Sequence, residues 1–228
     1  GADACVNLAG TSTGDRNGCL DEDGDTYSDP DPSGTNGSVW LVSNGADAFL
    51  GDSTQWLDTD GDGFGDNPPP ANSGDACPTT SGTSSQDRIG CTDTDGDGYS
   101  DADLIWLAHP TGTADAFPND NTQWLDSDGD GYGDDANGSS PDAFPDNAAE
   151  WADTDGDEVG NNADAFPFDP SQQNDSDGDG FGDNERGSGA DKFPNDSTQW
   201  SDIDGDGYGD NQDGTNPDAF IADPTQWT

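Results

Sequence analysis

The chain has 228 residues, of which 51 are acidic and only four are basic, so its formal net charge is -47 at pH 7. Such a surface repels nucleic acid and anionic membranes and attracts multivalent cations. Leu, Ile, Val and Phe together account for only 25 residues, too few to offset a backbone entropy cost of roughly 1–2 kcal/mol per residue. The chain is therefore either disordered or held together by metal ions and disulfides.

The chain begins with a cysteine segment, and a similar segment recurs after the first two acidic loops. Cys5 and Cys19, and likewise Cys77 and Cys91, are separated by thirteen residues in near-duplicate contexts. We expect two local disulfides, Cys5–Cys19 and Cys77–Cys91, which indicate an oxidising compartment and a secreted or cell-surface location. Four free thiols are the alternative, and a zinc site is disfavoured because no CxxC spacing or clustered His accompanies them.

Seven acidic loops of one pattern are distributed along the chain. They begin at Asp21, Asp58, Asp93, Asp126, Asp153, Asp175 and Asp202 and are numbered 1 to 7 in this order. In DSDGDGYGDD at 126–135, five aspartates fall within ten positions. A generic acidic run is usually a solvated, disordered segment, but a register kept over seven copies favours a binding loop for a hard cation.

A second phrase, here called the DAF phrase, separates most loops. It reads ADAFLGDSTQWLD at 46–58 and recurs at 114–126, 141–153, 163–175, 190–202 and 217–228. Phe and Trp are seven residues apart in five copies, and Gln173 replaces the Trp in the 163–175 copy. The stretch between a loop and the next DAF phrase varies in length, which predicts a rigid unit with elastic joints.

A larger duplication overlies these repeats, because 3–67 and 75–135 share the same order of segments. We therefore divide the chain into a first unit at 1–72, a second unit at 73–140 and short tandem repeats at 141–228. All three belong to one continuous, elongated array whose repeats contact only their neighbours.

The predicted fold class is an irregular, mostly coil repeat array with a few short β-strands and no significant helix. The only continuous apolar runs, SVWLVS at 38–43 and DLIWLAH at 103–109, predict these strands. Gly and Pro interrupt every window of helical length.

The register of the acidic loops predicts calcium ligands. Aspartates occupy positions 1, 3, 5 and 9, a glycine stands at position 6 in most loops, and position 7 offers its backbone carbonyl. Sites with six to eight oxygen ligands suit Ca²⁺ better than Mg²⁺. The predicted ligands are Asp21, Asp23, Asp25 and Asp29; Asp58, Asp60, Asp62 and Asp66; Asp93, Asp95, Asp97 and Asp101; Asp126, Asp128, Asp130 and Asp134; Asp153, Asp155, Asp157 and Asn161; Asp175, Asp177, Asp179 and Asp183; and Asp202, Asp204, Asp206 and Asp210.

The EF-hand comparison fails at position 12, where a bidentate Glu is expected and where these loops carry no Glu. In loop 5, which has no insertion, position 12 is Asp164, the Asp of a DAF phrase. By inference the equivalent aspartates close the other loops, with the insertions looped out. These predicted closing residues are Asp47, Asp75, Asp115, Asp142, Asp164, Asp191 and Asp218. Loop 5 is the poorest, since Glu158 replaces the glycine and Asn161 replaces the ninth aspartate.

The motifs GDACP at 74–78 and QWLDTDGDGFGD at 55–66 resemble thrombospondin type 3 repeats, and the similarity covers nearly the whole chain. The resemblance implies repeats with little regular secondary structure that wrap around a line of Ca²⁺ ions, with roughly 7–14 ions per chain. Phe stands at most of the family's Cys positions, at Phe49, Phe117, Phe144, Phe166, Phe193 and Phe220. We expect Phe, Trp and the loop aromatics Phe64, Tyr99, Tyr132, Phe181 and Tyr208 to pack together in place of disulfides between repeats.

The sequence offers no arrangement of a nucleophile and a base, so we expect no enzyme. Each Ca²⁺ neutralises two charges, and its binding free energy becomes folding free energy. The hypothesis is an extracellular calcium-stabilised rod that serves as a filament subunit and associates head to tail. The alternatives are a spacer or adhesin segment of a larger surface protein, with matrix or surface partners, and a calcium buffer.

Overall fold

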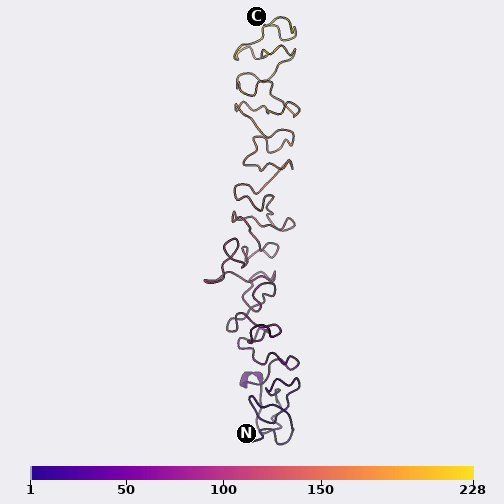
Figure 1. The fold of residues 1–228 in the computed structure, drawn as a ribbon, viewed down its shortest axis with the longest axis vertical. Coiled ribbons are helices and arrows are strands. Elements are labelled where there is room, and N and C mark those ends of the chain that lie inside the picture. The colour runs from indigo at the N-terminus through magenta and orange to yellow at the C-terminus, as the bar shows by residue number, and fades with distance from the viewer. Residues whose placement is uncertain (1) are drawn as a thin grey trace. The chain divides into compact units, whose positions relative to one another are not determined.

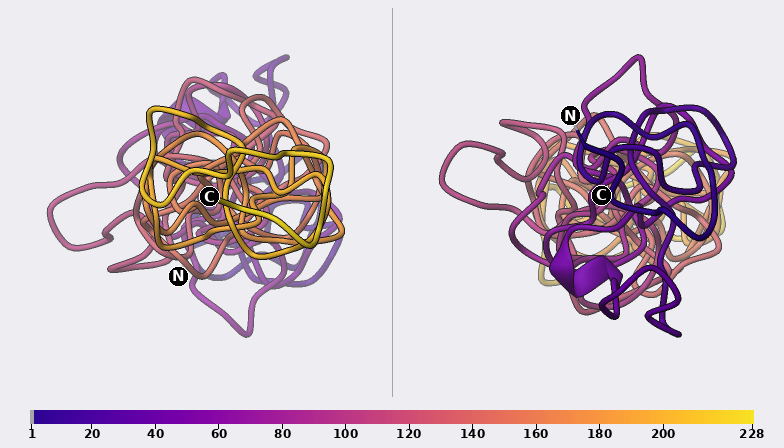
Figure 2. Two further views of the ribbon diagram at one scale, coloured as in Figure 1. Left: turned by 90° about the horizontal axis from the view of Figure 1, so that it is seen from above. Right: turned by 90° about the horizontal axis from the view of Figure 1, so that it is seen from below.

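The computed structural model describes residues 2–228. Within them the only helix is η1, a single 3₁₀ turn at Val42–Asn44, which is also the only helical ribbon in Figures 1 and 2. β-structure in the same residues is confined to six isolated bridges. The expectation of an irregular, mostly coil chain without significant helix is confirmed. No helix in the described part is long and apolar enough to cross a membrane.

The chain divides into two compact units. The first ends at Leu125 and contains both cysteine segments, loops 1 to 3 and η1. The second is Asp126–Thr228 and contains loops 4 to 7.

The two apolar inserts do not form the expected strands. In the first insert, Trp40 makes one antiparallel bridge with Asp31 and the chain then turns into η1. In the second, the Asp103 carboxylate accepts the N–H groups of Ile105 and Trp106, both at 2.8 Å. These bonds turn the chain at the point where a strand would have to remain extended.

The buried residues are mainly polar. Among the described residues, the buried hydrophobic side chains are only the cysteines Cys5, Cys19 and Cys91 and the alanines Ala46 and Ala114. The buried polar residues are aspartates, glutamines, serines and one glutamate. A polar interior is stable only where hydrogen bonds or ions compensate the lost hydration. The contacts of these buried polar residues therefore determine how the acidic loops are held.

The two disulfides are confirmed. Cys5 bonds to Cys19 and Cys77 bonds to Cys91, with Cα–Cα distances of 4.9 and 5.1 Å, and no described cysteine is free. Disulfides persist mainly in oxidising compartments.

Candidate metal centres

The first aspartate of each loop shapes the loop. Its Oδ1 accepts the N–H of position 4 at 2.6–2.8 Å, and its Oδ2 accepts the N–H of position 6 at 2.9–3.2 Å, in all seven loops. The glycine at position 4 has a φ of 79–84° wherever it occurs, a conformation that glycine adopts without a Cβ penalty. The side chain of one residue thus folds the loop tightly enough to bring alternate carboxylates together.

Positions 5 and 9 also take part in this loop structure. The position 5 carboxylate accepts the N–H of position 7 through Oδ1 at 2.7–3.0 Å. The side chain at position 9 accepts the N–H of position 2 at 2.9–3.4 Å. In loops 2, 3, 4 and 6, its second oxygen accepts the hydroxyl of position 2 at 2.5 Å. Position 9 therefore faces the base of the loop.

The carboxylates at positions 1, 3 and 5 lie together. In loops 1 to 5, one oxygen from each of these three aspartates lies within 4.8 Å of the others, and two further groups of the same kind occur. Such a triplet has the donor atoms and spacing to hold a metal ion.

The DAF aspartates close the loops from outside. In every repeat the N–H of this aspartate donates to the carbonyl of position 8 of the preceding loop, at 2.7–3.0 Å. In the six repeats other than the fifth, the inserted chain between them loops out. The pairs are Asp47 with Ser28, Asp75 with Gly65, Asp115 with Ser100, Asp142 with Gly133, Asp164 with Gly160, Asp191 with Gly182 and Asp218 with Gly209. These are the aspartates that the sequence predicted, from loop 5, to close the same loops; their role as calcium ligands stays a prediction.

The closing aspartates are buried, and five of the seven have one oxygen without a hydrogen-bond partner. All seven are at most 7% exposed. Their Oδ1 atoms accept the N–H two residues later at 2.6–2.7 Å. In five of the seven, Oδ2 is buried without a hydrogen-bond partner: Asp75, Asp115, Asp142, Asp164 and Asp218.

The same holds for carboxylates at positions 3 and 5. Buried oxygens without partners occur at Asp23, Asp60, Asp95, Asp128, Asp155, Asp177 and Asp204 at position 3, and at Asp25, Asp97, Asp130, Asp179 and Asp206 at position 5. Every loop contributes at least two such aspartates once its closing residue is included. A buried carboxylate oxygen without a partner is costly, and a bound cation is the usual compensation.

Burial and neighbouring carboxylates also raise the pKa of two closing aspartates. Burial raises the pKa of Asp47 to about 6, the N–H of Phe49 opposes the shift, and nearby Asp25, Asp23 and Asp29 add to it. Burial likewise raises the pKa of Asp115 to about 7, with further contributions from the carboxylates of loop 3. Both closing residues therefore lie close enough to the carboxylates of their loop for those negative charges to raise their pKa.

Several buried residues that position the loops were not anticipated from the sequence. Gln55, Gln123, Gln172 and Gln199, which precede the Trp position, are at most 1% exposed. The Gln199 amide donates to the carbonyls of Asn211 and Thr215 at 3.0 Å and accepts the Asn211 N–H at 3.0 Å. Gln55 and Gln172 make the equivalent three contacts. The repeated TQW triplet was the available signal.

Loops 1 and 3 use the cysteine segments instead. Asp15 accepts both the N–H and the hydroxyl of Ser28 at position 8, at 2.9 and 2.6 Å. Asp87 holds Ser100 in the same way. A serine at position 8 with an aspartate thirteen residues earlier is the sequence signal for this arrangement.

Aromatic stacking joins loops 1, 3, 4, 6 and 7 to the following DAF phrase, and the predicted loop aromatic Phe64 of loop 2 is in none of these stacked pairs. Five ring pairs have centroid distances of 4.8–5.3 Å and interplanar angles of at most 8°: Tyr27–Trp56, Tyr99–Trp124, Tyr132–Trp151, Phe181–Trp200 and Tyr208–Trp227. The position 7 aromatic is thus the stacking partner of the Trp, and Tyr27 belongs to this set although it was not predicted.

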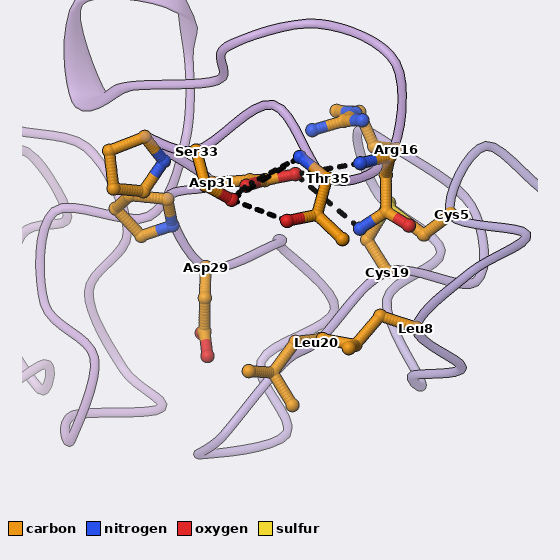
Figure 3. Close-up of a pocket in the computed structure, with 12 residues that line it drawn as sticks. Cys5, Leu8, Arg16, Cys19, Leu20, Asp29, Asp31, Ser33 and Thr35 are labelled. Atoms are coloured by element: carbon orange, nitrogen blue, oxygen red, sulfur yellow. Dashed lines mark hydrogen bonds between the residues drawn. A yellow bond between two sulfur atoms is a disulfide. The ribbon is translucent and has the colours of Figure 1, made fainter.

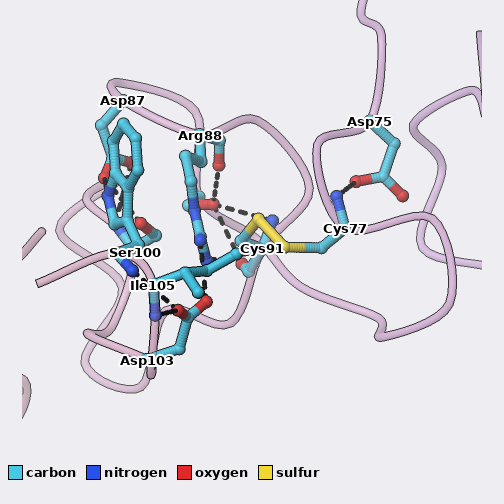
Figure 4. Close-up of polar contacts among 10 residues, drawn as sticks. Asp75, Cys77, Asp87, Arg88, Cys91, Ser100, Asp103 and Ile105 are labelled. Carbon is cyan, nitrogen blue, oxygen red and sulfur yellow. Dashed lines mark hydrogen bonds and ion pairs between the residues drawn. A yellow bond between two sulfur atoms is a disulfide. The ribbon is translucent and has the colours of Figure 1, made fainter. Parts of the chain in front are cut away.

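The second cysteine segment contacts loop 2. The N–H of Gly82 donates to Asp62 Oδ2 at 2.9 Å, and Asp75, the closing residue, accepts the N–H of Cys77 at 2.6 Å. Figure 4 shows Asp75 beside the Cys77–Cys91 disulfide, with Arg88 paired to Asp103 at 2.8 Å on the other side.

A separate pocket of about 230 Å³ lies at the first cysteine segment and is lined by Arg16 and Asp31, among others (Figure 3). Both Asp31 oxygens are used, since Oδ1 accepts the Ser33 hydroxyl at 2.7 Å and Oδ2 accepts the Asn36 N–H at 3.1 Å. These bonds lower the pKa of Asp31, first through the Ser33 hydroxyl. This pocket therefore lacks the unsatisfied carboxylates of the loops.

Comparison with known proteins gave no match, either to a protein family model or to a curated protein sequence.

Proposed function

We propose that the chain is an extracellular calcium-binding structural protein whose seven loops, each with its closing aspartate, bind Ca²⁺. One observation carries the proposal: in all seven repeats, buried carboxylate oxygens without partners occur at loop position 3 and at position 5, the closing aspartate or both. All-oxygen, carboxylate-rich sites suit Ca²⁺, and the resemblance to thrombospondin type 3 repeats supports the same ion.

When bound, calcium would neutralise the converging carboxylates. Positions 1 and 9 would keep the loop folded through their N–H contacts, while positions 1, 3 and 5 and the closing residue would supply oxygens to the ion. Because few apolar side chains are buried, ion binding contributes much of the folding free energy.

The mechanical role is a calcium-dependent rod or spacer. A chain whose repeats contact mainly their neighbours becomes rigid only when every repeat is ordered. Leu104 and Ile105 are 99% and 89% exposed and provide apolar surface for self-association into a filament. A spacer or adhesin segment of a larger surface protein is the rival function, and a calcium buffer is a third.

Electron microscopy in a few millimolar calcium, repeated after excess chelator, tests the proposal. Filaments that dissolve on chelation support a structural polymer, and single rods that collapse on chelation support a spacer. Identical particles under both conditions would contradict a calcium-stabilised structure. Isothermal titration of the chelated protein gives the number of bound ions, expected at about one or two per repeat.

A further inference from the structure

The fifth repeat differs from its neighbours at the proposed site. Asp157, at position 5 of loop 5, accepts a hydrogen bond on Oδ2 from Gln173 Nε2 at 2.5 Å. In loops 4, 6 and 7 the corresponding oxygen, of Asp130, Asp179 or Asp206, is buried and has no partner. A cation in the fifth site must therefore displace or share a contact that the other three sites of this unit lack.

The same glutamine removes the ring stack. In the other three repeats of this unit the position 7 aromatic lies flat on the following Trp at 5.1–5.3 Å. In the fifth repeat Val159 stands at position 7 and Gln173 stands at the Trp position. The DAF phrase that supplies the next loop is thus not held by stacked rings here.

The loop itself has weaker elements. Glu158 occupies position 6 with a φ of 75°, a left-handed conformation that is strained for a residue with a Cβ. Asn161 at position 9 keeps the contact to the Thr154 N–H at 2.9 Å but carries no charge. The site therefore has one carboxylate fewer to attract a cation.

The support beneath the loop also differs. Glu150 replaces the buried glutamine and is 6% exposed. Its Oε2 accepts the Asn162 N–H at 2.9 Å, but a carboxylate cannot donate to the carbonyls that Gln199 holds in the seventh repeat. The fifth loop therefore lacks the two hydrogen bonds to backbone carbonyls that the buried glutamine makes in the seventh repeat.

The fifth repeat nevertheless retains the features of a site. Asp153, Asp155 and Asp157 form one of the metal-sized triplets. Asp164 is 7% exposed, and its buried Oδ2 has no hydrogen-bond partner. Both oxygens of Asp155 are likewise buried without partners.

We propose that the fifth repeat is a calcium-sensitive joint, whose site fills last as calcium rises and opens first as calcium falls. The inference rests on the proposed calcium-binding function. It follows because the departures at Asn161, Gln173 and Glu150 remove a charge, an unpartnered ligand oxygen and contacts that order the loop. As calcium falls, the second unit then loosens at 153–164 while its other loops remain closed.

Hydrogen exchange measured by mass spectrometry on the full chain, across a titration of free calcium, tests this. The quantity compared is the calcium concentration at which protection is half complete in peptides covering 126–142, 153–164, 175–191 and 202–218. We expect the midpoint for 153–164 to be about tenfold higher than the other three, because charge count and rigidity set calcium affinity.

Two double variants test whether the missing ring stack causes the higher midpoint of the fifth repeat. Val159→Tyr with Gln173→Trp should lower the midpoint of 153–164 toward those of its neighbours. Phe181→Val with Trp200→Gln should raise the midpoint of 175–191 by a similar factor. Asn161→Asp alone is a smaller change and should also lower the midpoint of 153–164. It replaces the double variant as the test if the double variant does not fold.

The outcomes distinguish the two proposals. If no loop gains protection with calcium, the calcium-binding function itself is wrong. If all loops gain protection but 153–164 does so at the same or a lower concentration, the joint is wrong and the function stands. The latter result would arise if the Gln173 amide turned its oxygen toward the ion and acted as a ligand.

Discussion

The side chain of Gln55 lies directly against the backbone of Gly65, at position 8 of loop 2. A Cβ built on Gly65 would lie 2.2 Å from Gln55 Cδ and Oε1. Gly182 and Gly209 face Gln172 and Gln199 at 2.0–2.1 Å in the same way. The glycine at position 8 is thus required by the buried glutamine and not by the loop turn, since none of the three has a positive φ.

Gly65→Ala should therefore destabilise the chain. The new methyl group must displace a glutamine with three hydrogen bonds, and overpacking of this kind costs about 1–3 kcal/mol. Denaturant unfolding in saturating calcium measures the change in free energy. Gly51→Ala is the matched control, because a Cβ there meets nothing within 4 Å. Equal unfolding free energies for the two variants would show that Gln55 does not hold loop 2.

The closing role of the DAF aspartate is tested in loop 7, where two aspartates compete for it. Asp213 stands at the EF-hand position 12 and is exposed, whereas Asp218 is 1% exposed with an unpartnered Oδ2. Asp218→Asn should weaken calcium binding at loop 7 by about tenfold or more, because it removes a charged ligand. Asp213→Asn should leave the affinity unchanged. The reverse result in a calcium titration would show that loop 7 is closed by the residue at EF-hand position 12, as in an EF-hand, and not by the DAF aspartate.

Much of this site could be predicted from spacing. The alternate aspartates define the loop. Loop 5 has no insertion, so Asp164 stands at its position 12, whereas insertions separate the equivalent Asp47 and Asp115 from their loops. A backbone bond from each closing aspartate to position 8 keeps that register whatever the insertion length. The pattern was therefore sufficient to pair loops with closing residues.

Other features could not be predicted because they depend on contacts that a pattern does not specify. The apolar inserts have strand composition, but a strand needs a neighbour, and Asp103 turns the second insert before it can pair. Burial of Gln199 was missed because glutamine is usually exposed, and only the folded chain shows the carbonyls that it satisfies.

Calcium affinity should depend on pH because protons and calcium compete for the closing aspartates. Burial raises the pKa of Asp115 to about 7 in the folded chain without metal, above the unfolded value of about 3.9. The folded, metal-free chain therefore loses stability as pH rises through the window from about 4 to 7, whereas calcium gains affinity over the same window as the proton leaves. Calcium titrations at about pH 5 and pH 7.5 should show weaker binding at the lower pH.

Asp115→Asn should reduce this pH dependence at loop 3, because the amide does not titrate. Asp31→Asn is the control: the Ser33 hydroxyl lowers the pKa of Asp31, and this residue is not a predicted ligand of any loop. An unchanged pH dependence in Asp115→Asn would assign the effect to other carboxylates.

The two disulfides should differ in their effect on calcium binding. Each closes a segment with a sequence separation of 14 residues, for which loss of the crosslink costs about 3 kcal/mol in the chain-entropy account. Both segments contact the loop that follows them, through Asp15 and Asp87. Only the second segment also contacts the loop that precedes it, through the Gly82 N–H on Asp62 Oδ2. In the first segment the corresponding N–H, of Gly10, donates to the Gly18 carbonyl at 2.8 Å.

Replacing Cys77 and Cys91 by serine should therefore lower both the unfolding free energy and the calcium affinity of loop 2. Replacing Cys5 and Cys19 should lower the unfolding free energy by a similar amount and leave loop 2 unaffected. Hydrogen exchange of 58–66 over a calcium titration separates the two effects, since it reports the loop directly. Equal midpoints in both variants would show that the Gly82 contact forms without the Cys77–Cys91 crosslink, and that this disulfide contributes to stability alone.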